Sequence, residues 1–424
     1  MNRTRAAKST AFEQPSLAAQ LGETLWQLAR GGDRDLLLAT VALLCQERDQ
    51  GHVCVALAEW QGQSLDGALP FPPVASWTAA LAATGLCSDD SANASVDASL
   101  DGGPRPLVVD GKQRLYLLRH YQTEQRLLAF LRRRLASPAT TTAEELRVAL
   151  GALQLLPGAA AGEPDWQLAA VAAAVHRSFA IVCGGPGTGK TTTVARLLAV
   201  LQHRNPTLRI ALAAPTGKAA ARLGEALRRS AQEQPALAAA TATLEPKTLH
   251  RLLGYLPLDD AFRAGSDQLL PYDVVVVDEA SMIDPAVLAV LFSALRDEAR
   301  LVLVGDKDQL AAVAAGQVLG DLCRAARPEL GPGEQLATFV EAATGMRLPV
   351  QPQAAPIADA TIALRINHRF AEQPGIGAFA RALAHRDHTA ALQALAAGHP
   401  DLVPAASAER ALAAVTDAIL LAAA

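Results

Sequence analysis

Several kinds of protein are excluded by what this chain of 424 residues has little of. Its five cysteines stand singly, without a C-x-x-C pair, which excludes a disulfide framework, argues against a zinc site and fits a reducing compartment. Aromatic side chains make up only 4% of the residues, and the net charge is −4. A charge so close to neutral gives no overall positive field that would attract nucleic acid. Any contact with DNA or RNA must therefore come from a local channel.

Segments that would target the chain to a membrane or a secretory route are also missing from the sequence. The longest apolar candidate, residues 411–424, is too short to span a bilayer and contains Asp417. The first eight residues are basic but lead into polar residues, unlike a signal peptide. We therefore expect a soluble, cytoplasmic protein.

The N-terminal third predicts a mainly helical module over residues 16–135. Apolar residues recur at helical spacing near Leu25 and over residues 36–45, and residues 107–118 are typical of a β-hairpin that turns at Asp110 and Gly111. The Ser/Asp/Gly-rich residues 88–106 indicate an exposed loop. A long amphipathic helix follows over residues 121–135. Its arginines form either a solvated face or a contact with a partner or DNA, and they are Arg126, Arg132, Arg133 and Arg134.

From Trp166 onward the pattern changes to alternating strands and helices. Each β-rich run is followed by turn residues and a helical stretch, which predicts a parallel sheet covered on both faces. The predicted strands are residues 179–183, 208–213, 274–278, 301–304 and 361–364. Two longer segments, residues 230–247 and the proline-rich residues 327–360, interrupt the pattern and predict functional or mobile loops.

The most informative motif follows the strand predicted at residues 179–183. Residues 184–191 read GGPGTGKT, the G-x-x-x-x-G-K-[ST] pattern of a phosphate-binding loop that opens a helix. Glycines let the backbone N–H groups turn toward a phosphate, and the helix N-terminus adds a partial positive charge. Lys190 is predicted to neutralise the β- and γ-phosphates, and the Thr191 hydroxyl to hold Mg²⁺. The nucleotide-binding residues predicted here are Gly184, Gly185, Pro186, Gly187, Thr188, Gly189, Lys190, Thr191 and Thr192.

Polar residues follow two further predicted strands. Four valines end in Asp278 and Glu279, and because parallel strands deliver their carboxyl ends to one edge, these acids are expected beside the phosphate-binding loop. Asp278 would share the Mg²⁺ ion with Thr191, and Glu279 would polarise the attacking water. Gln309, in the Gly-Asp-x-x-Gln-Leu stretch after the strand at residues 301–304, would lie near the γ-phosphate.

The run Pro215, Thr216, Gly217 and Lys218 also follows a predicted strand. It offers a helix N-terminus and a cation, which suits a phosphate of nucleic acid, although a plain helix cap explains it equally well.

Together these motifs resemble the superfamily 1B DNA helicases, and among them the RecD family of exodeoxyribonuclease V (RecBCD) subunits. The resemblance rests on the motifs above, taken in order with TLHRLLG at residues 248–254 and LRINHRF at residues 364–370, and on the N-terminal module. It implies an α/β fold with a RecA-like P-loop NTPase parallel sheet. The implied division is a partner-docking helical domain (1–136), a linker with a short helix (137–165), a first RecA-like domain (166–326), a proline-rich insertion (327–360) and the start of a second RecA-like domain (361–424).

The resemblance also assigns further residues and partners. It implies that Gln167 recognises adenine, that Arg369 reaches the γ-phosphate and that Thr248 and His250 line the path of single-stranded DNA. The implied cofactors are ATP and Mg²⁺. The implied activity is 5′→3′ movement on single-stranded DNA from duplex ends, beside RecB-like and RecC-like subunits, in double-strand-break processing, homologous recombination and repair.

One departure from the family concerns the part that follows Phe370. The family continues into a full second motor domain with two more motifs, whereas this sequence stops at Ala424. We therefore expect a fragment or a truncated product that binds ATP but hydrolyses it poorly alone. A free-standing superfamily 1B helicase, a conjugative relaxase-helicase and a non-catalytic nucleotide-binding subunit remain alternatives. The RecD-like N-terminal module argues against the relaxase, and Asp278, Glu279 and Gln309 argue against a small-molecule kinase.

Overall fold

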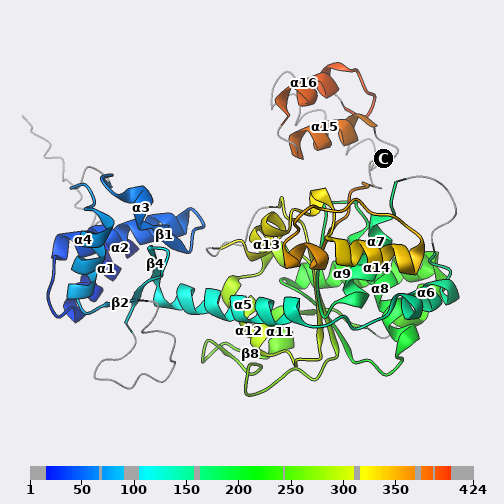
Figure 1. Cartoon of the computed structure of the whole chain (residues 1–424), viewed down its shortest axis with the longest axis horizontal. Coiled ribbons are helices and arrows are strands. Elements are labelled where there is room, and N and C mark those ends of the chain that lie inside the picture. Colours follow the sequence, from blue (N-terminus) through cyan, green and yellow to red (C-terminus); the bar gives the residue numbers. More distant parts are fainter. Residues whose placement is uncertain are drawn as a thin grey trace, which may run out of the picture. The chain divides into compact units, whose positions relative to one another are not determined.

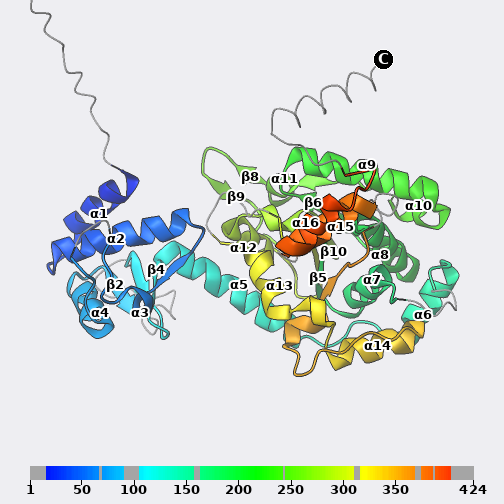
Figure 2. The same ribbon diagram turned by 90° about the horizontal axis from the view of Figure 1, so that it is seen from above.

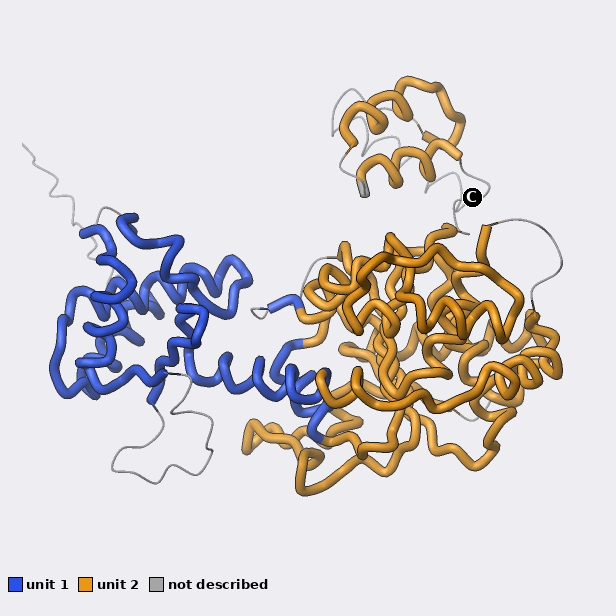
Figure 3. The backbone as a smooth tube through the Cα atoms, viewed as in Figure 1, with its two compact units in different colours: residues 1–131, 284–293, 311–317 blue, residues 132–283, 294–310, 318–424 orange. Residues whose placement is uncertain are grey.

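The computed structural model of the chain is drawn as a ribbon in Figures 1 and 2. It describes residues 16–65, 69–89, 105–156, 163–241, 244–309, 316–367, 374–384 and 387–402. The chain divides into two compact units (Figure 3). Unit 1 comprises the residues up to Leu131 together with 284–293 and 311–317, and unit 2 comprises the others. Within the described ranges, no helix is both long enough and apolar enough to cross a bilayer.

Unit 1 is mainly helical, as predicted, and also contains a small sheet. Its helices are α1 (Leu17–Leu28), α2 (Arg34–Asp49), α3 (Leu57–Trp60), α4 (Val74–Ala83), α12 (Pro285–Ser293) and the first part of α5 (Leu118–Ala136). Its strands are β1 (Cys54–Ala56), β2 (Cys87–Asp89), β3 (Leu107–Val109) and β4 (Arg114–Leu117), in the order β1-β4-β3-β2.

The predicted hairpin at residues 107–118 is confirmed, since β3 and β4 pair antiparallel. Asp110 stabilises its turn because one of its carboxylate oxygens accepts the backbone N–H groups of Lys112 (3.0 Å) and Arg114 (2.8 Å). The core of the unit is centred on Trp77, which stacks on Phe71. Most of the loop predicted at residues 88–106 lies outside the described residues.

The arginines of α5 lie in different surroundings. Arg126 and Arg132 are exposed, as a solvated face requires, and Arg133 pairs with Asp297 at 3.0 Å. Arg134, however, is only 2% exposed, and its guanidinium donates to the backbone carbonyls of Arg296 (2.6 Å) and Asp297. For Arg134 both interpretations are wrong, because this side chain fastens the end of α5 within unit 2.

Unit 2 is built on a six-stranded sheet in the order β12-β5-β11-β10-β6-β7, in which every neighbouring pair is parallel. The strands are β5 (Phe179–Cys183), β6 (Ile210–Ala214), β7 (Lys247–Thr248), β10 (Val274–Val277), β11 (Arg300–Gly305) and β12 (Thr361–Ala363). The α/β class with a parallel sheet is therefore confirmed. A separate hairpin pairs β8 (Tyr255–Leu256) with β9 (Ala261–Phe262).

Helices bury the sheet of unit 2. They are α6 (Ala143–Ala152), α7 (Trp166–His176), α8 (Lys190–Arg204), α9 (Gly217–Glu233), α10 (Pro235–Thr241), α11 (Leu249–Leu253), α13 (Val318–Ala326) and α14 (Glu334–Thr344), with 3₁₀ turns η1 (Ala280–Met282), η2 (Pro328–Leu330) and η3 (Pro356–Ala360). Alternate strand residues such as Val182 and Val276 enter one core with side chains of α6, α7, α8, α9, α10 and α14. In Figures 1 and 2, α7, α8 and α14 lie together over the sheet.

Three expectations about the C-terminal half are wrong. Residues 230–247 were predicted to be a functional or mobile loop, but residues 230–233 end α9 and residues 235–241 form α10. The strand predicted at residues 361–364 is confirmed as β12, but it pairs with β5 at the edge of this sheet, whereas the resemblance implies that it begins a second domain. Residues 327–360 were predicted to be a functional or mobile loop, but they contain α14, whose Leu336 and Val340 are fully buried. The segment joins the core because its apolar residues recur at helical spacing between the prolines.

The described residues after β12 form two further helices, α15 (Pro374–Ala384) and α16 (His388–Ala396), which pack on each other. Asp401 accepts the backbone N–H groups of Gly375 (3.2 Å) and Ile376 (2.9 Å) in the first turn of α15. Such a carboxylate stabilises the N-terminus of a helix. The remaining domain boundaries stay predictions.

Candidate nucleotide-binding site

The glycine-rich loop lies where the buried strand β5 meets α8. Gly187 and Gly189 have φ angles of 79° and 84°, which a side chain would strain. A Cβ on Gly184 would lie 2.6 Å from the Thr188 hydroxyl, and one on Gly189 would overlap the Gln167 amide. The backbone can take this path because glycine occupies these positions.

Lys190 begins α8 and folds back over the loop. Its ammonium donates to the carbonyls of Gly184 (2.7 Å) and Gly185 (3.2 Å). The Thr188 hydroxyl donates to the Gly185 carbonyl at 2.9 Å. The loop is therefore closed on itself around a cation, with Thr191 in the first turn of the helix.

Gln167 is brought to this loop by α7. Its amide donates to the Thr188 carbonyl at 3.2 Å, and the side chain is half-buried. Asp165 caps α7 by accepting the backbone N–H of Leu168 at 3.0 Å, which fixes the turn that carries Gln167. The structure thus brings together two residues that the motifs place 22 positions apart, 167 and 189.

The two acids follow β10, as predicted. The Asp278 backbone N–H donates to the Ala213 carbonyl at 2.9 Å, and its carboxylate accepts the Glu279 N–H at 2.9 Å. Burial raises the pKa of the Asp278 carboxyl to about 6; the hydrogen bond from Glu279 and the Lys190 charge oppose this shift, whereas the Glu279 charge adds to it. Glu279 has a φ angle of 51°, and its Oε2 is buried with no hydrogen-bond partner in the structure.

Gln309 follows β11 and is exposed. Its Oε1 accepts the hydroxyl of Ser281 at 3.2 Å, which joins it to the turn after Glu279. Sequence reasoning missed Ser281, although it lies in the same VDEASM stretch as the two acids. The signal that could have found it is its position two residues after Glu279 at the shared sheet edge.

These residues fit a nucleotide with its Mg²⁺ ion. Glycines at 184 and 189 give the loop a path that a Cβ would block against Thr188 and Gln167, and the Lys190 ammonium lies across the loop. Asp278 and Thr191 offer the oxygen ligands that Mg²⁺ prefers, and the unpartnered Oε2 of Glu279 leaves an acceptor for a water proton. The chemistry these donors support is phosphoryl transfer.

The candidate DNA-binding residues gather at the neighbouring part of the same edge. Pro215 follows β6, and the Thr216 hydroxyl caps α9 by accepting the backbone N–H of Ala219 at 3.2 Å. Gly217 and Lys218 are exposed in its first turn. Thr248 lies in β7 opposite Ala214, so the two motifs are adjacent.

His250 is exposed but not isolated. Its ring meets that of Tyr255 edge-on at 5.2 Å and lies 5.7 Å from that of Phe262 in the β8–β9 hairpin. Thr248 caps the short helix that carries it, because its hydroxyl accepts the backbone N–H of Arg251 at 3.2 Å. Both residues keep their predicted role in DNA binding as a proposal.

The last motif reaches the loop through residues that sequence reasoning did not single out. The Leu364 N–H donates to the Cys183 carbonyl at 2.8 Å, and the Asn367 amide donates to the Pro186 carbonyl at 2.9 Å. Arg369 lies outside the described residues. Its predicted contact with the γ-phosphate therefore stays a prediction.

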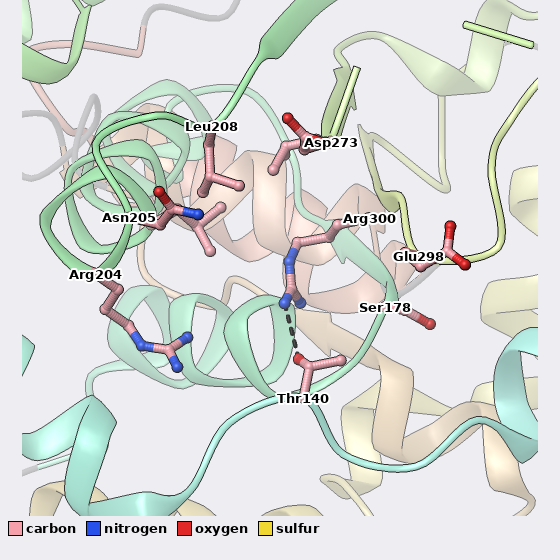
Figure 4. Close-up of a pocket in the computed structure, with 10 residues that line it drawn as sticks. Thr140, Ser178, Arg204, Asn205, Leu208, Asp273, Glu298 and Arg300 are labelled. Carbon is pink, nitrogen blue, oxygen red and sulfur yellow. Dashed lines mark hydrogen bonds between the residues drawn. The ribbon is translucent and has the colours of Figure 1, made fainter. Parts of the chain in front are cut away.

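A polar cavity of about 350 Å³ lies where the strands of the sheet begin, rather than where they end (Figure 4). Arg300 is only 8% exposed, and it donates to the Thr140 hydroxyl at 2.8 Å and to the carbonyls of Ala174 and Arg177. Burial lowers the pKa of Arg300 to about 10, and the nearby charge of Arg204 adds to the effect. Those carbonyls lie at the C-terminal end of α7. Arg300, which lines the cavity, therefore supports the helix that carries Gln167.

Two family models match the chain. Residues 15–116 match the one described as the RecBCD enzyme subunit RecD, N-terminal domain, and residues 167–315 match an AAA domain. The RecD subunit of Mycobacterium tuberculosis (strain ATCC 25618 / H37Rv) is 40% identical over 308 residues, which cover 71% of this chain and 49% of that protein. The RecD subunit of Mycolicibacterium smegmatis is 38% identical over 389 residues, covering 89% and 59%.

A further relative, the ATP-dependent RecD2 DNA helicase of Deinococcus radiodurans, is 35% identical over 230 residues, covering 51% of this chain and 27% of that protein. The chain spans about half the length of the RecD subunits it matches. Since it carries a RecD N-terminal domain followed by an AAA domain, the chain belongs to the RecD family.

Proposed function

We propose that this chain is an ATP-dependent DNA helicase subunit that moves 5′→3′ along a single strand in a RecBCD-type complex. Its partners are DNA at duplex ends and RecB-like and RecC-like subunits, and its role is double-strand-break processing, homologous recombination and repair. One observation carries the proposal. The GKT loop, Gln309 and the Asp278–Glu279 pair follow β5, β11 and β10, which are neighbours in one parallel sheet. The names of its relatives, RecD subunits and a RecD2 DNA helicase, support it.

Each residue has a stated task in this proposal. The loop amides and Lys190 bind the β- and γ-phosphates, and Thr191 and Asp278 hold Mg²⁺. The bound ion neutralises charge on the phosphates. Glu279 orients the attacking water and accepts its proton at Oε2, the buried oxygen without a partner. Gln309 contacts the γ-phosphate, and Arg369 stabilises the charge that develops there.

Single-stranded DNA lies on the adjacent edge in this proposal. The N-terminus of α9 with Lys218, and the neighbouring Thr248 and His250, bind phosphates and base faces. Such contacts are tolerant of sequence and sensitive to salt.

The test is ATP hydrolysis by the full chain, with and without single-stranded DNA and with RecB-like and RecC-like subunits added. We expect DNA to stimulate Mg²⁺-dependent hydrolysis in the assembled complex and Lys190→Ala to abolish the share due to this chain. To isolate that share, the RecB-like subunit carries a matching Lys→Ala change in its own phosphate-binding loop. A flat response to DNA with ATP still bound would instead favour a nucleotide-binding subunit without turnover. Loss of Mg²⁺-dependent ATP binding by the wild-type chain would overturn the proposal.

A further inference from the structure

An arginine to which the sequence motifs assign no role, Arg365 of the LRINHRF stretch, lies over the ring of the tryptophan that precedes Gln167. The guanidinium carbon of Arg365 lies 3.6 Å from the centroid of the Trp166 ring. Trp166 is buried, with 4% of its surface exposed, whereas Arg365 is exposed. A buried ring therefore backs the guanidinium of an exposed arginine.

Hydrogen bonds of Arg365 itself and of its neighbours in the chain fix its position. Its Nη2 donates to the Pro328 carbonyl at 3.2 Å. Leu364, the preceding residue, donates to Cys183 at the end of β5, and Asn367 donates to Pro186 inside the loop. A short segment bonded at one end to β5 and at the other to the phosphate-binding loop therefore carries Arg365.

Trp166 connects this arginine to the residue predicted to read adenine. It directly precedes Gln167 in α7, and Gln167 contacts Thr188 and fits against Gly189. The stacked pair thus lies next to Gln167, at the side of the loop where a base would be read. In the proposed function, the phosphates are instead bound by Lys190 and the backbone amides of the loop.

A guanidinium held flat suits a base better than a phosphate. It is planar and delocalised, and it stacks on aromatic faces while a ring behind it keeps it in that plane. We propose that Arg365, held against Trp166, stacks its outer face on the purine base whose edge Gln167 recognises. This inference rests on the proposed function, because it names a further residue of the same ATP site.

The test compares two ligands on the full chain: Mg²⁺–ATP, and ribose 5-triphosphate, which has the sugar and phosphates but no base. We expect Arg365→Ala to weaken ATP binding about tenfold, the scale of a partly desolvated cation–π contact, and to leave the base-less ligand unaffected. Arg365→Lys keeps the charge but not the flat face, so it also weakens ATP binding. Arg347→Ala is the matched control, since Arg347 is an exposed arginine of the same unit that pairs with Glu341.

Each other outcome contradicts a different part of the idea. Full affinity in Arg365→Lys would show that charge alone matters, and equal loss for both ligands would assign Arg365 to the phosphates. Unchanged ATP affinity in Arg365→Ala would also overturn the inference. Thermal unfolding of each variant checks that the fold is kept. Failure of the wild-type chain to bind ATP at all would instead remove the proposed function.

Discussion

At the scale of single residues, Glu279 combines two features that a structural acid does not need. Its φ angle of 51° places a residue with a side chain in the left-handed region, which costs about 1–2 kcal/mol, and its Oε2 is buried without a partner. Both features belong to the turn that directly follows β10. Strain of this kind is retained where a side chain must be presented in one orientation.

Glu279→Gln tests that role. The amide keeps the size of the side chain but cannot accept a proton, so we expect ATP to bind with unchanged affinity and hydrolysis to fall at least about 100-fold. Retention of radiolabelled ATP after gel filtration, beside a turnover assay, measures both quantities. Glu334→Gln, at an exposed glutamate in the first turn of α14, serves as control. Normal turnover in Glu279→Gln would remove Glu279 from the chemistry.

Gly189 offers a second test at the residue scale. Gly189 and Gly345 have similar φ angles, 84° and 75°, so alanine strains the backbone about equally at both. A Cβ at Gly189 overlaps the Gln167 amide, whereas one at Gly345 meets nothing within 4 Å. We expect both variants to lose about 1 kcal/mol of stability and only Gly189→Ala to lose Mg²⁺–ATP affinity, as measured by calorimetry. Equal ATP affinity in the two variants would contradict the packing of Gln167 against the loop.

At the scale of elements, the strands that could be predicted most closely are those followed directly by glycines or acidic residues. β5 ends where glycines begin, and β10 ends at Val277, directly before Asp278, so the predicted bounds of both strands lie within a residue of the observed ones. α14 was missed because prolines and glycines flank it and mask its helical spacing. β12 was predicted as a strand, but its pairing with β5 was not, because a chain pattern gives the order of strands and not which strands pair.

α14 provides a test of that correction. Leu336 is fully buried in the core that also holds α7 and the sheet, so Leu336→Ala should lower the free energy of unfolding by about 2–5 kcal/mol. Thr338→Ala, on the exposed side of the same helix, should leave it within about 0.5 kcal/mol. Thermal unfolding of the full chain followed by calorimetry measures both. Equal stability of the two variants would return residues 327–360 to a surface loop.

A second element-scale prediction concerns the edge where the strands begin. Asp273 accepts the backbone N–H of Arg209 at 2.8 Å and the guanidinium of Arg296 at 2.7 Å, which ties the start of β10 to its neighbours. Hydrogen bonds from Arg209, and then from Arg296, hold the pKa of Asp273 well below its ordinary value. A depressed pKa stabilises the fold above the unfolded value of about 3.9, and this stabilisation is lost as the pH falls further.

Asp273→Asn should therefore lower the unfolding temperature at pH 7 by about 2–4 °C. The gap between the unfolding temperatures of wild type and variant should narrow only below about pH 4. Calorimetric scans of wild type and variant from pH 7 to pH 3 measure the gap. Asp321→Asn, at an exposed acid that pairs with Arg324 on α13, is the control. A gap that stays constant down to pH 3 would mean that the ionised carboxylate contributes nothing.

At the scale of the whole molecule, the small net charge decides how DNA can be bound. A charge of −4 supplies no general attraction, so binding must depend on a few local cations. Sequence reasoning placed Lys218 among them, and the structure puts it in the first turn of α9, beside the motif that contains Thr248. Residue order alone could not show this proximity, because it arises from the pairing of β6 with β7.

Lys218→Ala should therefore weaken the binding of single-stranded DNA, and the dependence of that binding on salt, more than most single surface changes would. Each phosphate neutralised on a single strand contributes about 0.7 to the slope of log affinity against log salt concentration, so the slope should become shallower by about that amount. Titrating fluorescent oligonucleotides of two sequences at several salt concentrations measures it, and the loss should be the same for both sequences, since a phosphate contact carries no sequence information. Arg324→Ala, an exposed cation on α13, should leave the slope unchanged. An unchanged slope in Lys218→Ala would exclude the N-terminus of α9 from the path of the strand and leave the Thr248–His250 segment as the remaining proposed contact.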